Sequence, residues 1–139
     1  MTIEQAVASK LKAVLGHDRV YPENVPEKQN VWPCIVYAHA GDDEQMSLNN
    51  AASVDHRDVF QVEIWGPDRL ACALERDALK AAFKGANCQG QWGQTDTNVG
   101  VCVAGAFARD ASADIAPAND GTDRHDRLER LTLTINWYG

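Results

Sequence analysis

The sequence lacks the features that place a protein in a membrane. Its apolar runs fall far short of the roughly 20 residues that span a bilayer. The N-terminus has no basic segment followed by an apolar one, which is the pattern of a secretory signal peptide. We therefore expect no membrane partner. The 139 residues, of which 45% are apolar, suffice for a single domain over residues 1–139.

Positive charge is also scarce. Thirteen Lys and Arg residues stand against twenty Asp and Glu residues, which gives a formal net charge of −7 at pH 7. Because Lys and Arg contacts to phosphate supply most affinity for nucleic acid, this balance argues against a protein that grips DNA or RNA. It leaves open a surface along which DNA passes without being held.

Cysteine occurs only singly. The four residues are Cys34, Cys72, Cys88 and Cys102, with no Cys-x-x-Cys pair. Without an export signal, these thiols are expected to be reduced. Free cysteine is among the most often buried residue types. The pattern therefore predicts small apolar packing groups.

Motifs for metals and nucleotides are missing as well. The histidines, His17, His39, His56 and His125, are scattered, and none has the i, i+4 spacing of a helical metal pair. Residues 42–44 (Asp-Asp-Glu) lack the ligand spacing and the glycine of an EF-hand loop. Glycine-rich nucleotide loops are absent. We expect neither a metal nor a cofactor.

Catalytic pairs are not recognisable either. Residues 55–58 (Asp-His-Arg-Asp) enter a strand, where neighbours point to opposite faces, so they cannot converge on one ligand and are interpreted as solvated. Cys34 and His39 are five residues apart on one predicted strand, and therefore on opposite faces. Cys34, Cys72 and Cys102 have no basic sequence neighbour that could activate them. These observations predict that the protein is not an enzyme.

The clearest pattern that is present is an alternating strand followed by an amphipathic helix. Phe60, Val62 and Ile64 alternate with polar residues, as in a strand with one buried face. Pro67 suits the first position of a helix, where its missing N–H costs nothing. The buried stripe of that helix is predicted to comprise Leu70, Leu74, Ala78 and Ala81, with Gly85 just past its end.

A first helix and further strands surround this unit. Thr2 and Gln5 form the capping box of a helix that begins at Ile3 and stops at Gly16. Phe107 is expected to share one face of a later strand with the valines before it. The further strands are predicted at residues 20–22, 33–39, 99–107 and 131–137, and the polar residues 86–98 are interpreted as a loop.

The order of these elements indicates an α+β protein. Consecutive strands joined by loops favour antiparallel pairing. Two helices with one apolar stripe each can cover one face of a sheet. We therefore predict a two-layer sandwich in which two helices pack on one face of a mostly antiparallel sheet of roughly four to five strands. Leu11, Leu74 and Ala78 are expected to meet the inward row of that sheet.

Two polar segments are longer than strand connection requires. Residues 41–57 form either a projecting hairpin, which we favour because the flanking strands are consecutive, or an acidic loop. Residues 109–127 are acidic and irregular. Ordering such segments costs about 1–2 kcal/mol per residue, which a partner surface can offset. The subunit and partner interface is therefore predicted at Asp42, Asp43, Glu44, Met46, Leu48, Asn49, Asn50, Asp110, Asp114, Asp120 and Asp123.

Four stretches, taken in order, form a pattern that can be compared with known families. They are residues 19–22 (Arg-Val-Tyr-Pro), 32–37 (Trp-Pro-Cys-Ile-Val-Tyr), 60–66 (Phe-Gln-Val-Glu-Ile-Trp-Gly) before an alanine-rich helix, and 131–137 (Leu-Thr-Leu-Thr-Ile-Asn-Trp). Together they resemble the tail completion (tail terminator) proteins of tailed phages. The resemblance covers nearly the whole chain, and its motifs are structural. Residues 85–98 are longer and more polar than is typical of the family.

The resemblance implies a structural virion protein of a long-tailed phage or prophage. Such proteins assemble as a ring, commonly a hexamer, at the head-proximal end of the tail tube. The ring stops tube polymerisation and joins the tube to the head–neck connector. DNA only passes through its lumen, and an acidic chain suits this because like charge repels phosphate. The implied partners are the chain itself, the tube protein and the connector protein, in the virion tail or in the host cytoplasm during assembly.

Two other functions remain open. One is a stand-alone α+β ligand-binding module of the bacterial cytoplasm, which would use the sheet face without helices. Polar residues expected on that face, such as Gln61, Glu63 and Thr132, count against an apolar ligand pocket. The other is a small hydrolase with a cysteine nucleophile, which would need a base beside the thiol.

Overall fold

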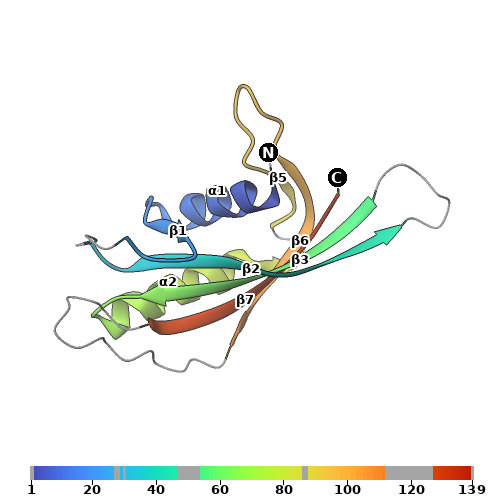
Figure 1. Cartoon of the computed structure of the whole chain (residues 1–139). Helices are drawn as coiled ribbons and strands as arrows, with labels where there is room; N and C mark the ends of the chain where they lie inside the picture. The colour runs from blue at the N-terminus through green and yellow to red at the C-terminus, as the bar shows by residue number, and fades with distance from the viewer. Residues whose placement is uncertain are drawn as a thin grey trace.

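The computed structural model shows an α+β fold of two helices and one sheet (Figure 1). It describes residues 2–26, 29, 31–46, 54–85, 88–111 and 127–138. In chain order the elements are α1 (Ile3–Leu15), β1 (Val20–Pro22), β2 (Cys34–Met46), β3 (Val54–Trp65), α2 (Arg69–Ala82), β4 (Lys84–Gly85), β5 (Gly90–Trp92), β6 (Val101–Asp110) and β7 (Arg127–Tyr138).

The sheet has the strand order β1-β2-β3-β7-β6-β4, and β5 also pairs with β6. The pair β1–β2 is parallel, and the other described pairs are antiparallel, as predicted for most of the sheet. The prediction of four to five strands was wrong, since the described strands number seven. β4 has two residues and β5 has three, so both are too short to show an alternating pattern in the sequence. They are strands because they pair with β6.

Helix α1 matches its prediction. The side chain of Thr2 accepts a hydrogen bond from the Gln5 N–H at 3.2 Å, and the Gln5 side chain accepts one from the Thr2 N–H at 3.0 Å. Gly16 ends the helix with φ = 74°, a left-handed conformation that costs glycine little. Ile3, Val7 and Leu11 are buried. The apolar spacing therefore identified the correct face of this helix.

Helix α2 begins two residues later than predicted. Asp68 is the N-cap, and its carboxylate accepts a hydrogen bond from the Leu70 N–H at 3.0 Å. Pro67 lies just before this cap rather than inside the helix. Because Asp offers the side-chain acceptor that proline lacks, the cap forms one residue after the proline.

The apolar residues of α2 form two rows, and the structure buries the row that was not predicted. Cys72 and Leu79 are buried, and so is Phe83 just after the helix. Leu70 and Leu74 are 68% and 62% exposed. The predicted contact of this second row with the core was therefore wrong. We call the exposed row the outer stripe; it consists of Leu70, Leu74, Ala78 and Ala81.

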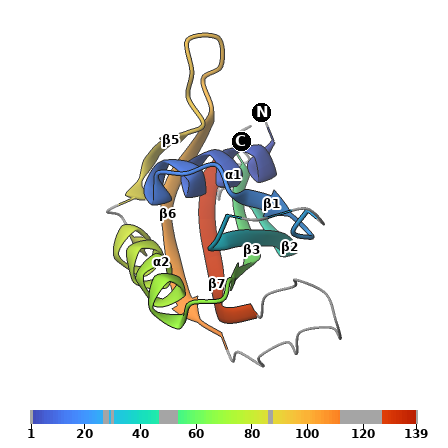
Figure 2. The ribbon, with the colours of Figure 1, turned by 90° about the vertical axis from the view of Figure 1, so that its left-hand side faces the viewer.

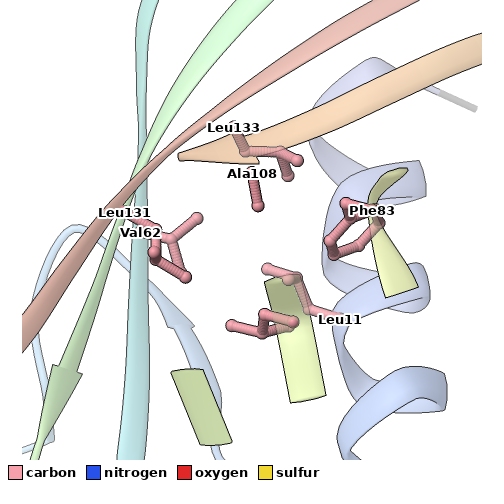
Figure 3. A pocket seen from close by; sticks show the side chains of 7 residues that line it. Leu11, Val62, Phe83, Ala108, Leu131 and Leu133 are labelled. Atoms are coloured by element: carbon pink, nitrogen blue, oxygen red, sulfur yellow. The ribbon is translucent and has the colours of Figure 1, made fainter. Parts of the chain in front are cut away.

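The core forms where the inward rows of the sheet meet both helices. The predicted sheet residues are buried, namely Phe60, Val62 and Ile64 of β3 and Leu131, Leu133 and Ile135 of β7. Figure 2 shows α1 crossing in front of β7, with α2 beside the sheet on the same side. In Figure 3 the side chains of Leu11 and Phe83 point toward those of Val62 and Leu133. Together with their neighbours they leave no room for a water molecule between them.

Strand β6 departs from simple alternation. Its pairing with β7 shifts between Val103 and Gly105, which marks a bulge or irregularity. Val101 and Val103 are buried before the shift, and Ala106 is buried after it. Phe107 is consequently 48% exposed. The prediction that it shares the face of the valines was wrong, because one irregular residue reverses the faces of those that follow.

Candidate functional site

The strands β2 and β3 form a long antiparallel hairpin that extends beyond both helices (Figure 1). Their pairing continues out to Met46 and Val54, with one register shift after His39. A hairpin rather than an acidic loop is therefore confirmed for the described part of residues 41–57. The remaining residues, 47–53, lie outside the described chain, and with them Leu48, Asn49 and Asn50.

The acidic residues predicted for the interface in the first segment lie on this hairpin. Asp42, Asp43 and Glu44 follow one another on β2, and the register places Arg57 opposite Asp43 and His56 opposite Glu44. Unlike charges at directly opposed positions stabilise an antiparallel pair by roughly 0.2–1 kcal/mol. The same register places Asp42 opposite Asp58, so within the acidic run of β2 only Asp43 lies opposite a Lys or Arg residue.

A buried carboxylate lies where the hairpin leaves the core. Asp58 is 3% exposed, and it is the only buried charged residue in the part of the chain that the structure describes. Its Oδ1 is 2.6 Å from Nε2 of His39, and its Oδ2 accepts a hydrogen bond of 2.5 Å from Nε1 of Trp137. The interpretation of residues 55–58 as solvated was wrong for Asp58, because it shares the inward face of β3 with Phe60.

His39 connects this carboxylate to helix α1. Its Nδ1 lies 3.9 Å from Oε1 of Glu4. A carboxylate only accepts hydrogen bonds, so the imidazole carries a proton on the Nε2 that faces Asp58. Trp137 in turn stacks on His56, with 4.2 Å between the ring centroids. These five residues form what we call the root cluster, which joins α1, β2, β3 and β7 but contains no hydroxyl or thiol nucleophile.

Asp110 is the one predicted interface residue of the second segment that the structure describes. Its carboxylate pairs with Nζ of Lys80 on α2 at 2.8 Å. Asp110 pairs with Leu131 of β7, and Leu131 pairs on its other side with Val62 of β3. Val62 is about 27 Å along β3 from Val54, the last described residue of the hairpin on that strand. The structure therefore separates Asp110 from the hairpin within one subunit. Asp114, Asp120 and Asp123 lie outside the described residues.

The cysteines behave largely as packing groups. Three are buried as predicted, whereas Cys102 is exposed. Burial raises the pKa of Cys34 and that of Cys72 to about 11. The Cys34 thiol also lies 3.2 Å from the carbonyl oxygen of Val31, to which it can donate. Both of these thiols are therefore protonated at neutral pH, whereas the thiolate is the nucleophilic form.

Within the described ranges, no group of three or more His, Cys, Asp or Glu residues could hold a metal ion. Among the helices that the structure describes, none is long and apolar enough to cross a membrane. No protein-family model matches the chain, and a search of curated proteins finds no match either.

Proposed function

We propose that this chain is a tail completion protein of a long-tailed phage or prophage. In this role it is a structural subunit rather than an enzyme, and it forms a ring, a hexamer by the resemblance, on the head-proximal end of the tail tube. The ring stops tube polymerisation and joins the tube to the head–neck connector protein. The observation that carries the proposal is the β2–β3 hairpin, which projects beyond the helix-covered part of the sheet (Figure 1).

A projecting hairpin of this length favours a protein that is completed by neighbours. Ordering its backbone costs about 1–2 kcal/mol per residue. Strands that no described helix covers bury less apolar surface within the subunit, so less of that cost is offset there. A neighbouring subunit or the tail tube can supply the missing surface. Each subunit of a ring on the tail tube contacts neighbouring subunits and the tube.

Charge supports the same role. The chain carries a net charge of −7, and three consecutive acidic residues lie on the hairpin. An acidic ring repels the phosphates of DNA, which lets DNA pass through the lumen without being held. The expected location is accordingly the virion tail, and the host cytoplasm while tails assemble.

The two alternatives receive less support from the described residues. A ligand-binding module that uses the sheet face without helices needs an apolar pocket there, whereas the polar residues Gln61 and Glu63 of β3 are partly exposed. A cysteine hydrolase needs a thiolate, whereas burial raises the pKa of Cys34 and Cys72 to about 11. Neither alternative accounts for a hairpin that extends past the helices.

Deleting residues 46–52 tests the proposal in a phage that carries this chain. The shortened protein is expected to fold, since the deletion leaves the root cluster and the core intact. It should be a monomer in solution, and particles complemented with it should have tails of uncontrolled length under the electron microscope. Val99→Ser, which changes an exposed residue away from the hairpin, serves as the matched control. Tails of normal length with the shortened chain would contradict the proposed role.

A further inference from the structure

We propose that two copies of the free protein pair through their α2 helices, which cross antiparallel at the outer stripe. The inference goes beyond the proposed function. A contact of one surface with the same surface is isologous, so it relates two subunits by a two-fold axis and is complete with two copies. It therefore differs from a ring contact, which repeats from each subunit to the next.

The outer stripe leaves two large apolar side chains in water. Leu70 is 68% exposed and Leu74 is 62% exposed, and their i, i+4 spacing places them side by side on one helix face. The helix does not need them for its own packing, because Cys72 and Leu79 already bury its other face. Figure 2 shows α2 at the margin of the molecule, so a second helix can reach it.

Side-chain size along the stripe identifies a second α2 as the partner. The two leucines lie in the first half of the helix, whereas the exposed residues Ala78 and Ala81 lie in the second half. Leu70, Leu74 and Ala78 form one i, i+4 ridge, the kind of ridge that packs into the groove of another helix. When a second α2 crosses antiparallel, its alanines face the leucines of the first. Large side chains then fill the space above small ones, as in a close-packed interior.

The charged residues beside the stripe are already paired within the subunit. Arg76 forms ion pairs with Asp77 at 3.1 Å and with Glu129 at 3.0 Å. Lys80 pairs with Asp110 at 2.8 Å. This surface therefore selects no partner of opposite charge. In a chain with a net charge of −7, it is also a place where two copies repel each other little, because its carboxylates are matched by cations.

The ends of the helix favour the antiparallel orientation. Asp68 and Arg69, both exposed at the first turn, carry one charge of each sign. In an antiparallel pair, the positive N-terminal end of each helix dipole lies beside the negative C-terminal end of the other. A parallel pair would place like ends together. The helix dipoles therefore select the same orientation as the side-chain sizes.

The contact is small, which sets the conditions of the test. A single helix crossing buries less than the roughly 1,200–2,000 Å² of a standard interface, so we expect a transient pair. At low micromolar concentration the subunits should be monomers, and pairs should appear as the concentration rises toward about 1 mM. Sedimentation of the full chain over this range measures the dissociation constant of the pair.

Two charge variants of the full chain test both the surface and the orientation. Leu74→Lys and Ala78→Glu each put a charge into the stripe, so each alone should raise the dissociation constant about tenfold or more. In an antiparallel crossing, Leu74 of one copy faces Ala78 of the other. A mixture of the two variants therefore brings the introduced charges together, and it should pair at least about threefold more tightly than either variant alone.

Val99→Glu is the control, because Val99 is 77% exposed and lies outside the outer stripe. It should pair like the wild type. Circular dichroism checks that each variant folds, and Leu70→Lys provides a second position on the stripe. A wild type that stays monomeric up to about 1 mM overturns the inference, and so do stripe variants that pair like the wild type. A mixture that pairs no better than its components rules out the antiparallel crossing, and the inference with it.

Tail assembly separates this inference from the proposed function. The pair contact is not a ring contact, so particles complemented with Leu74→Lys should have tails of normal length. Tails of uncontrolled length with this variant would show that the outer stripe meets a tail or ring partner instead. That result overturns the inference and leaves the proposed function in place. The deletion of residues 46–52 tests the proposed function by itself.

Discussion

Helices α1 and α2 lie on the same face of the sheet but use their apolar residues differently. α1 has one apolar row, and Ile3, Val7 and Leu11 in that row are buried. α2 has two such rows, and it turns Leu79 into the core while Leu74 stays exposed. A single apolar row can be assigned to the core from its spacing alone. Two rows on one helix mean that one of them is available to something outside the subunit.

The two helices also differ in the polar contacts beside them. Next to the first turn of α1, the root cluster holds Asp58 in a buried setting between His39 and Trp137. Next to α2, Arg76 and Glu129 pair at 3.0 Å with side chains that are 29% and 21% exposed. The α1 side therefore has one fully buried carboxylate, whereas the α2 side has several partly solvated pairs, which include Glu75 with His17 and Lys80 with Asp110, each at 2.8 Å.

The largest expected effect comes from truncating the core-facing leucines. Leu11→Ala and Leu79→Ala should each lower the free energy of unfolding by about 2–5 kcal/mol, the usual cost of a cavity in a packed core. Leu74→Ala should change it by no more than about 0.5 kcal/mol, because the side chain is already in water. Urea unfolding of the three variants measures this. A Leu74→Ala variant as unstable as Leu79→Ala would show that the outer stripe is packed after all.

A smaller effect is expected from the polar contacts. Asp58→Ala leaves His39 and Trp137 without their buried acceptor, which should cost about 1–3 kcal/mol. Glu129→Ala removes one partner of a partly exposed ion pair and should cost roughly 0.2–1 kcal/mol. The comparison uses urea unfolding at neutral pH, with both variants checked for native circular dichroism. Equal losses for the two variants would remove the distinction between the α1 and α2 sides.

The smallest effect concerns the thiols, and it checks which face of α2 is inward. Burial raises the pKa of Cys72 and of Cys34 from 9.0 to about 11, so the folded state favours the neutral thiols. Their contribution to stability is complete below pH 9 and is lost as the pH rises toward 11. The double variant Cys34→Ala, Cys72→Ala should lose less stability over this range.

At neutral pH a maleimide should label exposed Cys102 in the native protein, and native labelling of Cys72 would place it outside the core.

Much of the fold could be predicted because it follows from local spacing. The capping box at Thr2, the stop at Gly16 and the alternation around Val62 are read within a few residues. β5 could not be predicted, because it exists only through pairing with β6. Phe107 was misplaced because an irregularity in the middle of a strand leaves no clear signal in its composition.

The candidate site was predictable only in part. The hairpin followed from the order of consecutive strands, and its acidic residues are where they were expected. Extending the alternation back from Phe60 by two residues would have placed Asp58 on the inward face. Its burial, however, depends on His39 and Trp137, which come from strands far apart in the chain. The exposure of Leu74 likewise depends on which row of α2 meets the sheet, and apolar spacing cannot decide between two rows.

The position of β7 has a consequence for how the protein is made. β7 lies between β3 and β6, although it follows both along the chain. While the polypeptide emerges from the ribosome, β3 and β6 therefore have no common neighbour until residues 127–138 have been synthesised. Sheets that depend on such distant pairing form late and slowly. An unfinished chain thus cannot hold a complete sheet, and incomplete subunits are kept out of any assembly that requires one.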